Sequence, residues 1–359
     1  MRCVSVSELR EGMDLARTIC AGDGKVLLQR NVRLNSYFIS RLKELKIPFV
    51  YIKSDPDEDV EAIKGPVTQE VRAYATATLQ QVLQKADSSG ITHVKDLKKA
   101  TQMLVDDILR NDDVIANIAE VRSFDSYTFE HSVNVCVLSL LTAKRLGWTR
   151  ERLEELGMGA LLHDTGKVFL PKETLVKPTK LTPEEYQMVQ RHAKMGFDLL
   201  RGSIPLLASH VSYQHHERYD GSGYPRGLKG TDIHVFGRVV ALADSFDAMT
   251  TPRAYQPRRF EDEAAKELTD LAGTLYDPNL LGAFLRSVAL YPLGSTVWLN
   301  TGEVGEVVAA TNETLTVRVY PDGAGCGETA AVSVDGRQDM VRDYVIDKNS
   351  ATQVVKRLI

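Results

Sequence analysis

The placement of histidine is the feature that most restricts how this chain can fold. Seven of its eight histidines lie between His131 and His234, in a region where apolar residues recur at helical spacing. Thr149 and Thr182 are predicted helix N-caps, and Thr182 begins a capping box with proline at the first helical position. The pattern predicts a helical domain over residues 112–290, with histidines at helix ends and on inward faces.

The segments on either side of this domain follow other patterns. Residues 1–66 mix short β-branched runs, turns, one helix and an acidic linker, which predicts a small α+β accessory module. Residues 67–111 have the spacing of two connecting helices. Residues 291–359 hold short strand-like runs separated by Gly, Asn and Asp, which predict a small β-barrel or sandwich. The predicted fold class is therefore mainly α, with a small module at each end.

Composition excludes several kinds of partner and location. The content of 43% hydrophobic and 26% charged residues is typical of a soluble globular protein. With a net charge of -4 and no long basic run, we expect no binding to a DNA or RNA duplex or to a membrane surface. The four cysteines lack CxxC spacing, and no signal-peptide pattern or apolar stretch of about 18 residues appears. We expect a cytoplasmic protein.

A set of imidazoles and carboxylates forms a predicted metal site. The sequence HDTGK puts His163 and Asp164 at a helix C-terminus, and a carboxylate beside a histidine can bridge two divalent ions that share an activated hydroxide. Lys167 follows one helical turn after His163, so it is predicted to offset charge on a phosphate and not to bind metal. The seven candidate ligands are His131, His163, Asp164, His192, His215, His216 and Asp244.

A single buried histidine or aspartate is more often a hydrogen-bonded structural residue than a ligand. The ordered set is more specific than any one member, because a histidine, the HD pair, a histidine, a histidine pair and an aspartate follow one another. The remaining histidines, His93, His210 and His234, are not part of this ordered set. We expect His93 and His210 to be structural or exposed, and His234 stays unassigned.

Three long segments follow this order: HDTGK, HHERYDGSGYPRGLKG and GRVVALADSFDAMTTPRAY. Together they resemble the signature of the HD-GYP family, bacterial phosphodiesterases of the HD superfamily, and the resemblance covers roughly residues 125–292. ELREGMDLARTI and YPLGSTVWLNTGEVGEVV resemble segments that accompany this domain in some members. The resemblance implies hydrolysis of the second messenger cyclic di-GMP to linear pGpG, with two metal ions that are commonly iron and sometimes manganese.

The resemblance also implies how the ligands are shared between the ions. Members that take a third metal have Glu four residues before the first histidine, and that position is Tyr127 here. This favours two metals, pGpG as the main product and a slow second step to GMP. Carried over by position, one ion is held by His131, His163, Asp164 and Asp244, and the other by Asp164, His192, His215 and His216.

Substrate contacts are implied by two further parts of the family pattern. Gly223, Tyr224 and Pro225 match the GYP loop, which shapes the pocket beside the ligand in the family. Asp247 and Arg253 match positions that can contact the nucleotide, and arginine suits a phosphate or a guanine edge through its planar fork.

Two alternatives stay open from the sequence. One is an HD hydrolase that acts on another cyclic dinucleotide or on a nucleotide, because sequence does not determine the shape of the base pocket. The other is a weakly active member that binds ligand as a signalling adaptor. Homodimerisation and binding of signalling protein partners also stay open.

Overall fold

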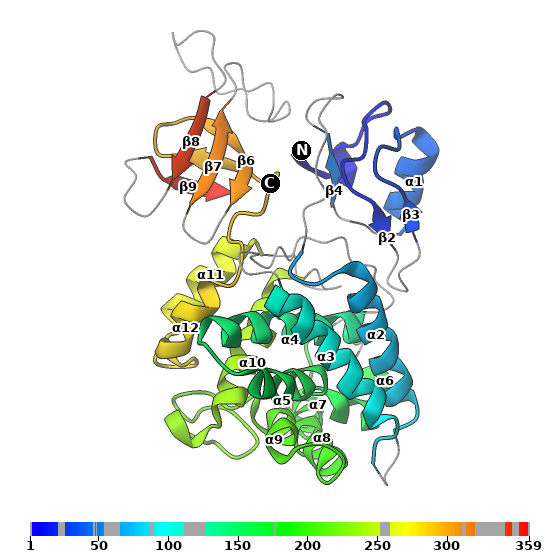
Figure 1. Ribbon diagram of the computed structural model, residues 1–359, viewed down its shortest axis with the longest axis vertical. Coiled ribbons are helices and arrows are strands. Elements are labelled where there is room, and N and C mark those ends of the chain that lie inside the picture. Colours follow the sequence, from blue (N-terminus) through cyan, green and yellow to red (C-terminus); the bar gives the residue numbers. More distant parts are fainter. Residues whose placement is uncertain are drawn as a thin grey trace. The chain divides into compact units, whose positions relative to one another are not determined.

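The computed structural model describes residues 2–20, 26–45, 47, 49–53, 65–86, 90–110, 127–175, 177, 179–251, 259–310, 314–319, 342–346 and 352–357 (Figure 1). One compact unit comprises Gly65–Asp112 and Thr128–Val288. Its elements are α2 (Gln69–Gln84), α3 (Val94–Arg110), α4 (Tyr127–Arg145), α5 (Arg150–Leu161), η2 (Thr165–Phe169), α6 (Lys172–Leu175), α7 (Pro183–Gln190), α8 (His192–Leu200), α9 (Leu206–Gln214), η3 (Gly230–Asp232), α10 (Val235–Thr250), α11 (Glu261–Asp270) and α12 (Pro278–Leu285).

Local capping begins the helices where the sequence predicts. The Thr149 side chain accepts from the backbone N–H of Arg152 at the start of α5. The Thr182 side chain and Glu185 form the predicted capping box at the start of α7, with Pro183 as the first helical residue. Both predictions are confirmed.

The two helices expected to connect the modules share a core with the helical unit. Leu79 and Val82 of α2 and Leu97 of α3 belong to one apolar cluster with Met158 of α5 and Leu199 of α8. α3 also packs along α5. These helices therefore contribute to the stability of the unit that carries the predicted ligands, because burying such side chains stabilises the folded state by about 1.5 to 3 kcal/mol each.

The N-terminal segment contains one α-helix and two small antiparallel sheets. β1 (Arg2–Ser5) pairs with β4 (Phe49–Ile52), and β2 (Ile19–Cys20) pairs with β3 (Val26–Leu28). The short 3-10 helix η1 (Val6–Glu8) follows β1, and α1 (Ser36–Glu44) lies between β3 and β4 in the chain. Buried Leu15, Leu42 and Val50 lie in one core cluster. The described part of this segment is thus α+β in content, as predicted.

The C-terminal segment forms a five-stranded antiparallel sheet in the order β8-β7-β6-β5-β9. The strands are β5 (Thr296–Leu299), β6 (Val304–Ala310), β7 (Leu315–Val319), β8 (Arg342–Ile346) and β9 (Val354–Arg357). Among the described strands β8 and β9 are the two edges, so these five strands form an open sheet and do not by themselves close the predicted barrel or sandwich. The predicted strand-like runs include β5, β6 and β7, whereas β8 and β9 were not predicted, and such runs carry no information on whether edge strands pair. The predicted run at 330–335 lies outside the described residues.

Among the described residues, no helix is both long enough and apolar enough to cross a bilayer.

Candidate metal centre

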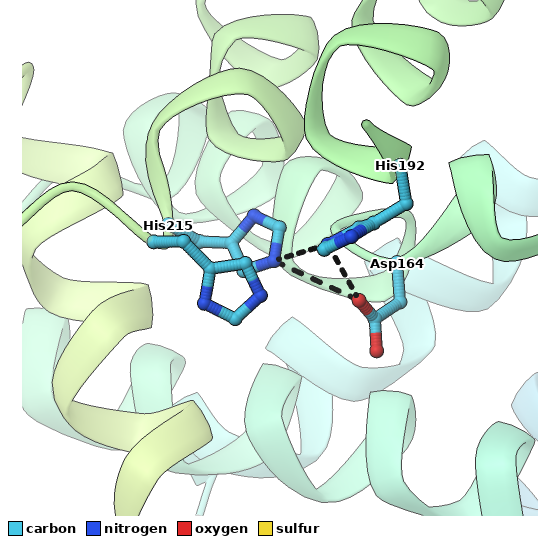
Figure 2. A group of neighbouring side chains, drawn as sticks. Asp164, His192 and His215 are labelled. Atoms are coloured by element: carbon cyan, nitrogen blue, oxygen red, sulfur yellow. Dashed lines mark hydrogen bonds and ion pairs between the residues drawn. The ribbon is translucent and has the colours of Figure 1, made fainter. Parts of the chain in front are cut away.

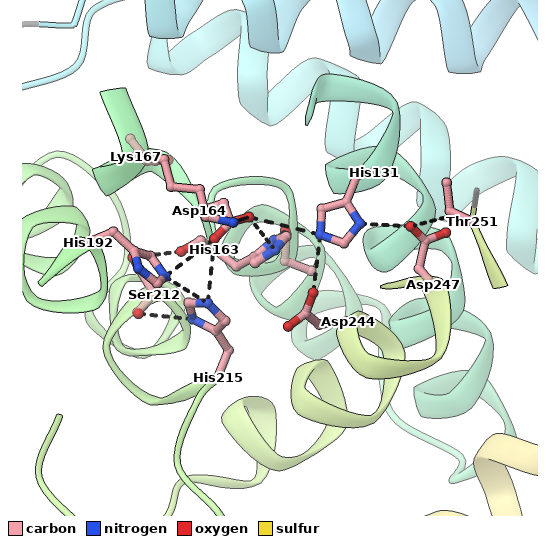
Figure 3. Close-up of polar contacts among 12 residues, drawn as sticks. His131, His163, Asp164, Lys167, His192, Ser212, His215, Asp244, Asp247 and Thr251 are labelled. Carbon is pink, nitrogen blue, oxygen red and sulfur yellow. Dashed lines mark hydrogen bonds and ion pairs between the residues drawn. The ribbon is translucent and has the colours of Figure 1, made fainter. Parts of the chain in front are cut away.

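One buried carboxylate faces two groups of imidazoles. Oδ1 of Asp164 lies 3.4 Å from Nε2 of His192 and 3.6 Å from Nε2 of His215 (Figure 2). Oδ2 of the same residue lies 3.4 Å from Nε2 of His163 and 3.9 Å from Nε2 of His131 (Figure 3). The two oxygens of Asp164 are therefore directed at different histidines, as a carboxylate shared by two cations requires.

The tautomers of three histidines are determined by the backbone. In His163, His192 and His215, Nδ1 lies 2.5 to 3.0 Å from the carbonyl oxygen three residues earlier. A carbonyl oxygen can only accept, so each Nδ1 carries the proton and each Nε2 presents a lone pair. The Nε2 atoms of His192 and His215 are 3.4 Å apart, and neither carries a proton that it could donate to the other. Such an arrangement of lone pairs suits a cation between them.

Burial keeps the imidazoles of one group neutral. It lowers the pKa of His192 to about 4, and it lowers the pKa of His215 and His216 below the ordinary imidazole value. Neutral imidazole is the form that binds metal. At neutral pH these three side chains are therefore available as ligands without first losing a proton.

The donor set fits divalent metal ions. Nε2 of His163 and Oδ1 of Asp164 are buried and make no hydrogen bond with any described residue. Imidazole nitrogen and carboxylate oxygen together suit first-row divalent metals. In each of two groups the ligand atoms lie within 4.8 Å of one another, and Asp164 belongs to both. One group is Asp164, His192, His215 and His216, and the other is His131, His163 and Asp164.

Two carboxylates of α10 hold His131 from opposite sides. Oδ1 of Asp244 lies 3.1 Å from Nε2 of His131, and Oδ2 of Asp247 lies 2.7 Å from Nδ1 (Figure 3). Burial opposes the charged imidazole, but the two carboxylates outweigh it and raise the pKa of His131 to about 9. Asp244 thus lies beside His131 of the second group, and its role as a metal ligand stays a prediction.

Asp247, expected from the resemblance to contact the nucleotide, contacts His131 in the structure. Its side chain is 0% exposed, and Thr251 also donates to it at 3.4 Å. A carboxylate that accepts the Nδ1 proton of a histidine ligand fixes the ring and leaves Nε2 for the metal. In the described residues Asp247 is therefore a support for His131, and its predicted contact with the nucleotide stays a prediction.

Replacing Asp247 by alanine is expected to weaken metal binding about 10- to 100-fold, because such supporting carboxylates typically contribute this much to metal affinity. Competition with a calibrated chelator measures the change. Asp270→Ala, an exposed position at the end of α11, is the control and should bind metal as the parent does. If the Asp247→Ala variant keeps its metal affinity but has a raised KM for the nucleotide, Asp247 contacts the nucleotide, as the resemblance implies.

Lys167 adds positive charge at the edge of this centre. Its Nζ lies 2.5 Å from Oδ2 of Asp164, and its side chain remains 31% exposed. Burial alone would raise the pKa of Asp164, but Lys167 and His163 outweigh it and hold that pKa well below its usual value. The carboxylate is therefore ionised at neutral pH, and the ammonium can also reach a ligand that approaches from solvent.

Asp164 and His192 are held together by a very close approach of two backbone segments. η2 follows directly on Asp164 and packs against α8, which begins at His192. A Cβ at Gly166 would overlap the carbonyl oxygen of His192 and would lie 2.6 Å from the amide nitrogen of Gly196. Backbone atoms cannot rotate away, so the contact requires glycine at position 166.

The predicted GYP loop covers one histidine of the centre. The Tyr224 ring stacks on His216 with centroids 4.7 Å apart, and its backbone N–H donates to the His216 carbonyl at 3.1 Å. A Cβ at Gly223 would lie 2.5 Å from the Cα of Glu217, so the tight return of the loop depends on this glycine. Burial raises the pKa of the Tyr224 phenol, which therefore stays protonated. Pro225 is exposed at the end of this turn.

Glu217 anchors the loop, and the sequence reasoning missed it. Its side chain is only 2% exposed, and its two oxygens accept from the backbone N–H groups of Arg226 at 2.9 Å and Leu228 at 3.0 Å. In the sequence, this role is indicated by the position of Glu217 directly after the histidine pair and before a glycine-rich loop.

Some predicted positions lie apart from the centre or outside the description. Arg253 is outside the described residues, and Tyr127 begins α4 but its side chain is likewise not described. His93 pairs with Asp96 at 3.2 Å. The other two histidines also have structural contacts: His210 packs on Phe197, and His234 accepts from the Phe236 N–H at the start of α10.

Known proteins resemble this chain in sequence and in fold. Residues 113–280 match the family model described as HD domain. A cyclic di-GMP phosphodiesterase from Pseudomonas aeruginosa is 36% identical over 211 residues, which cover 57% of this chain and 51% of that protein. A 3'3'-cGAMP-specific phosphodiesterase from Vibrio cholerae is 32% identical over 199 residues, covering 55% of this chain and 36% of that protein.

The chain thus spans about half the length of the first relative and about a third of the second. Among solved structures, an HDG"Y"P protein from Bdellovibrio bacteriovorus aligns with a TM-score of 0.52 and 21% identity, covering 79% of this chain and 97% of that chain. This likeness shows a shared fold.

Proposed function

We propose that this chain, whose residues 113–280 match the family model described as HD domain, is a metal-dependent phosphodiesterase that hydrolyses cyclic di-GMP to pGpG. The observation that carries the proposal is Asp164, one buried carboxylate whose two oxygens face two groups of histidine Nε2 atoms. The Pseudomonas relative, named for cyclic di-GMP, supports the substrate. In this proposal residues 112–290 carry catalysis, and the modules at 1–66 and 291–359 regulate it or mediate assembly.

The two groups of ligands would hold two ions that share Asp164. The HD-GYP resemblance implies iron, with manganese as the alternative, and nitrogen and oxygen donors suit either ion. Divalent ions held in this way supply an activated water and neutralise charge on a phosphodiester. The first ion would be held by His131, His163, Asp164 and Asp244, and the second by Asp164, His192, His215 and His216.

The chain's own residues have distinct tasks in this reaction. The Nδ1 bonds to backbone carbonyls keep the Nε2 lone pairs of His163, His192 and His215 on the centre. Lys167, beside Asp164 and partly exposed, offsets negative charge that develops on the phosphate. Tyr224, at the tip of the Gly223–Pro225 turn, covers His216 and keeps bulk water from that side.

A product assay with defined metals tests the proposal. Protein loaded anaerobically with Fe(II), and separately with Mn(II), is expected to convert cyclic di-GMP to pGpG with slow further release of GMP. Elemental analysis should find two ions per chain, and three tightly held ions would refute the argument from Tyr127. If 3'3'-cGAMP is hydrolysed faster than cyclic di-GMP, the preferred substrate would be the one for which the Vibrio relative is named. If the protein binds cyclic di-GMP but does not cleave it with any metal tried, the signalling-adaptor alternative would be favoured.

A further inference from the structure

A half-exposed tyrosine lies at the outer edge of the candidate metal centre. Outward from the ligand His216, the Tyr224 ring lies at 4.7 Å and the Tyr186 ring lies 6.5 Å beyond Tyr224, nearly perpendicular to it at 80°. Tyr186 is 50% exposed, whereas Tyr224 is partly buried. The three rings form a series that leads from a metal ligand to solvent.

The position of Tyr186 is fixed by the first turn of α7. Its backbone N–H donates to the Thr182 carbonyl at 2.8 Å, inside the capping box that Thr182 makes with Glu185. Nζ of Lys177 donates to both oxygens of Glu185, at 2.7 and 2.6 Å. The backbone that carries Tyr186 is therefore well anchored, although half of the side chain is open to solvent.

Apolar side chains are also exposed on the elements that follow the HD pair. Phe169 of η2 is 41% exposed and Leu175 of α6 is 38% exposed, and α6 contacts α7. Exposing large apolar groups costs free energy that a folded chain usually avoids by burial. Exposed apolar and aromatic side chains suit the flat face of a nucleobase more than they suit a phosphate or ribose.

We propose that Tyr186 is a stacking platform for one nucleobase of the cyclic dinucleotide, an inference that rests on the proposed function. A nucleobase is joined to the phosphate through a ribose, so it must lie away from the scissile bond while the phosphate is at the metal centre. Tyr224 occupies the position nearest the histidines, and Tyr186 is the next ring outward. Stacking of a base on an aromatic ring is tolerant of base identity, because every base has a π-face.

The test compares three variants of the full chain loaded with Fe(II). Tyr186→Ala is expected to raise the KM for cyclic di-GMP about 5- to 150-fold, the range that one lost base–aromatic stack gives. Its kcat and metal content should stay close to those of the parent. Tyr186→Phe keeps the ring and should keep the parent KM. Met188→Ala, two residues along α7 and 38% exposed, lies on a different helix face and should also keep it.

The outcomes separate this inference from the proposed function. A parent that hydrolyses cyclic di-GMP, with a Tyr186→Ala variant of identical KM, would overturn the inference alone. If the alanine and phenylalanine variants lose metal and kcat together, Tyr186 is a structural residue and the inference is also wrong. A parent that neither binds nor hydrolyses any cyclic dinucleotide, measured by calorimetry and by product analysis, would overturn the proposed function and the inference with it.

Discussion

Replacing Asp164 by alanine is expected to abolish both metal retention and turnover. Asp164 is the residue shared by the two groups of possible ligand atoms, so its loss would remove a ligand from both proposed ions. It also leaves Lys167 without the carboxylate that lies 2.5 Å from its Nζ. Because charge stabilisation by bound metal contributes several kcal/mol to such reactions, turnover should fall by about a thousandfold or more.

Elemental analysis and the pGpG assay should both be applied to that variant. Asp198→Ala is a matched control on α8, because this aspartate is 38% exposed and pairs with Lys194 at the surface. It should keep the parent's metal content and rate. An Asp164→Ala protein that still held two ions and hydrolysed cyclic di-GMP would refute the shared-ligand mechanism.

The second large effect is expected from Gly166→Ala. A Cβ at this position would overlap the carbonyl oxygen of His192 and approach the Gly196 nitrogen to 2.6 Å, so η2 and α8 would have to separate. Overpacking of this kind costs about 1 to 3 kcal/mol and sometimes more. Moving the His192 backbone also moves its Nε2 away from Asp164. We expect a lower free energy of unfolding in urea titrations, together with weaker metal binding.

Gly282→Ala on α12 is the matched control for this change. A Cβ there meets only an Arg286 guanidinium nitrogen at 3.5 Å, which is an ordinary contact with a flexible side chain. Alanine in place of glycine inside a helix stabilises it by up to about 1 kcal/mol, so this variant should be as stable as the parent or more so. Equal stabilities for the Gly166 and Gly282 variants would show that η2 and α8 can separate without cost.

Local signals in the sequence predicted the elements well, and long-range pairing poorly. Thr149 and Thr182 begin their helices as expected because an N-cap depends on residues within one turn. Three of the five described C-terminal strands, β5 to β7, lie in predicted strand-like runs, yet the open order of the sheet depends on which edges meet. Such pairing involves residues far apart in the chain, and alternation within a strand does not encode it.

The candidate centre shows the same division. The order of histidines and aspartates was sufficient to select the side chains that the structure brings together around Asp164. The order could not show that Asp247 lies behind His131, because that contact joins residues 116 positions apart. Glu217 was missed because its partners are backbone N–H groups, which are the same in every residue except proline.

Two histidine ligands also terminate helices, and this affects the order in which ligands can bind. His163 donates to a carbonyl at the end of α5, and His215 donates to one at the end of α9. The last carbonyls of a helix carry partial negative charge. Two such ends, together with the Asp164 and Asp244 carboxylates, add negative potential at the ligand atoms, which favours cations over a phosphate anion. Productive binding should therefore be sequential, with cations entering first and the dinucleotide associating only with the charged holo form.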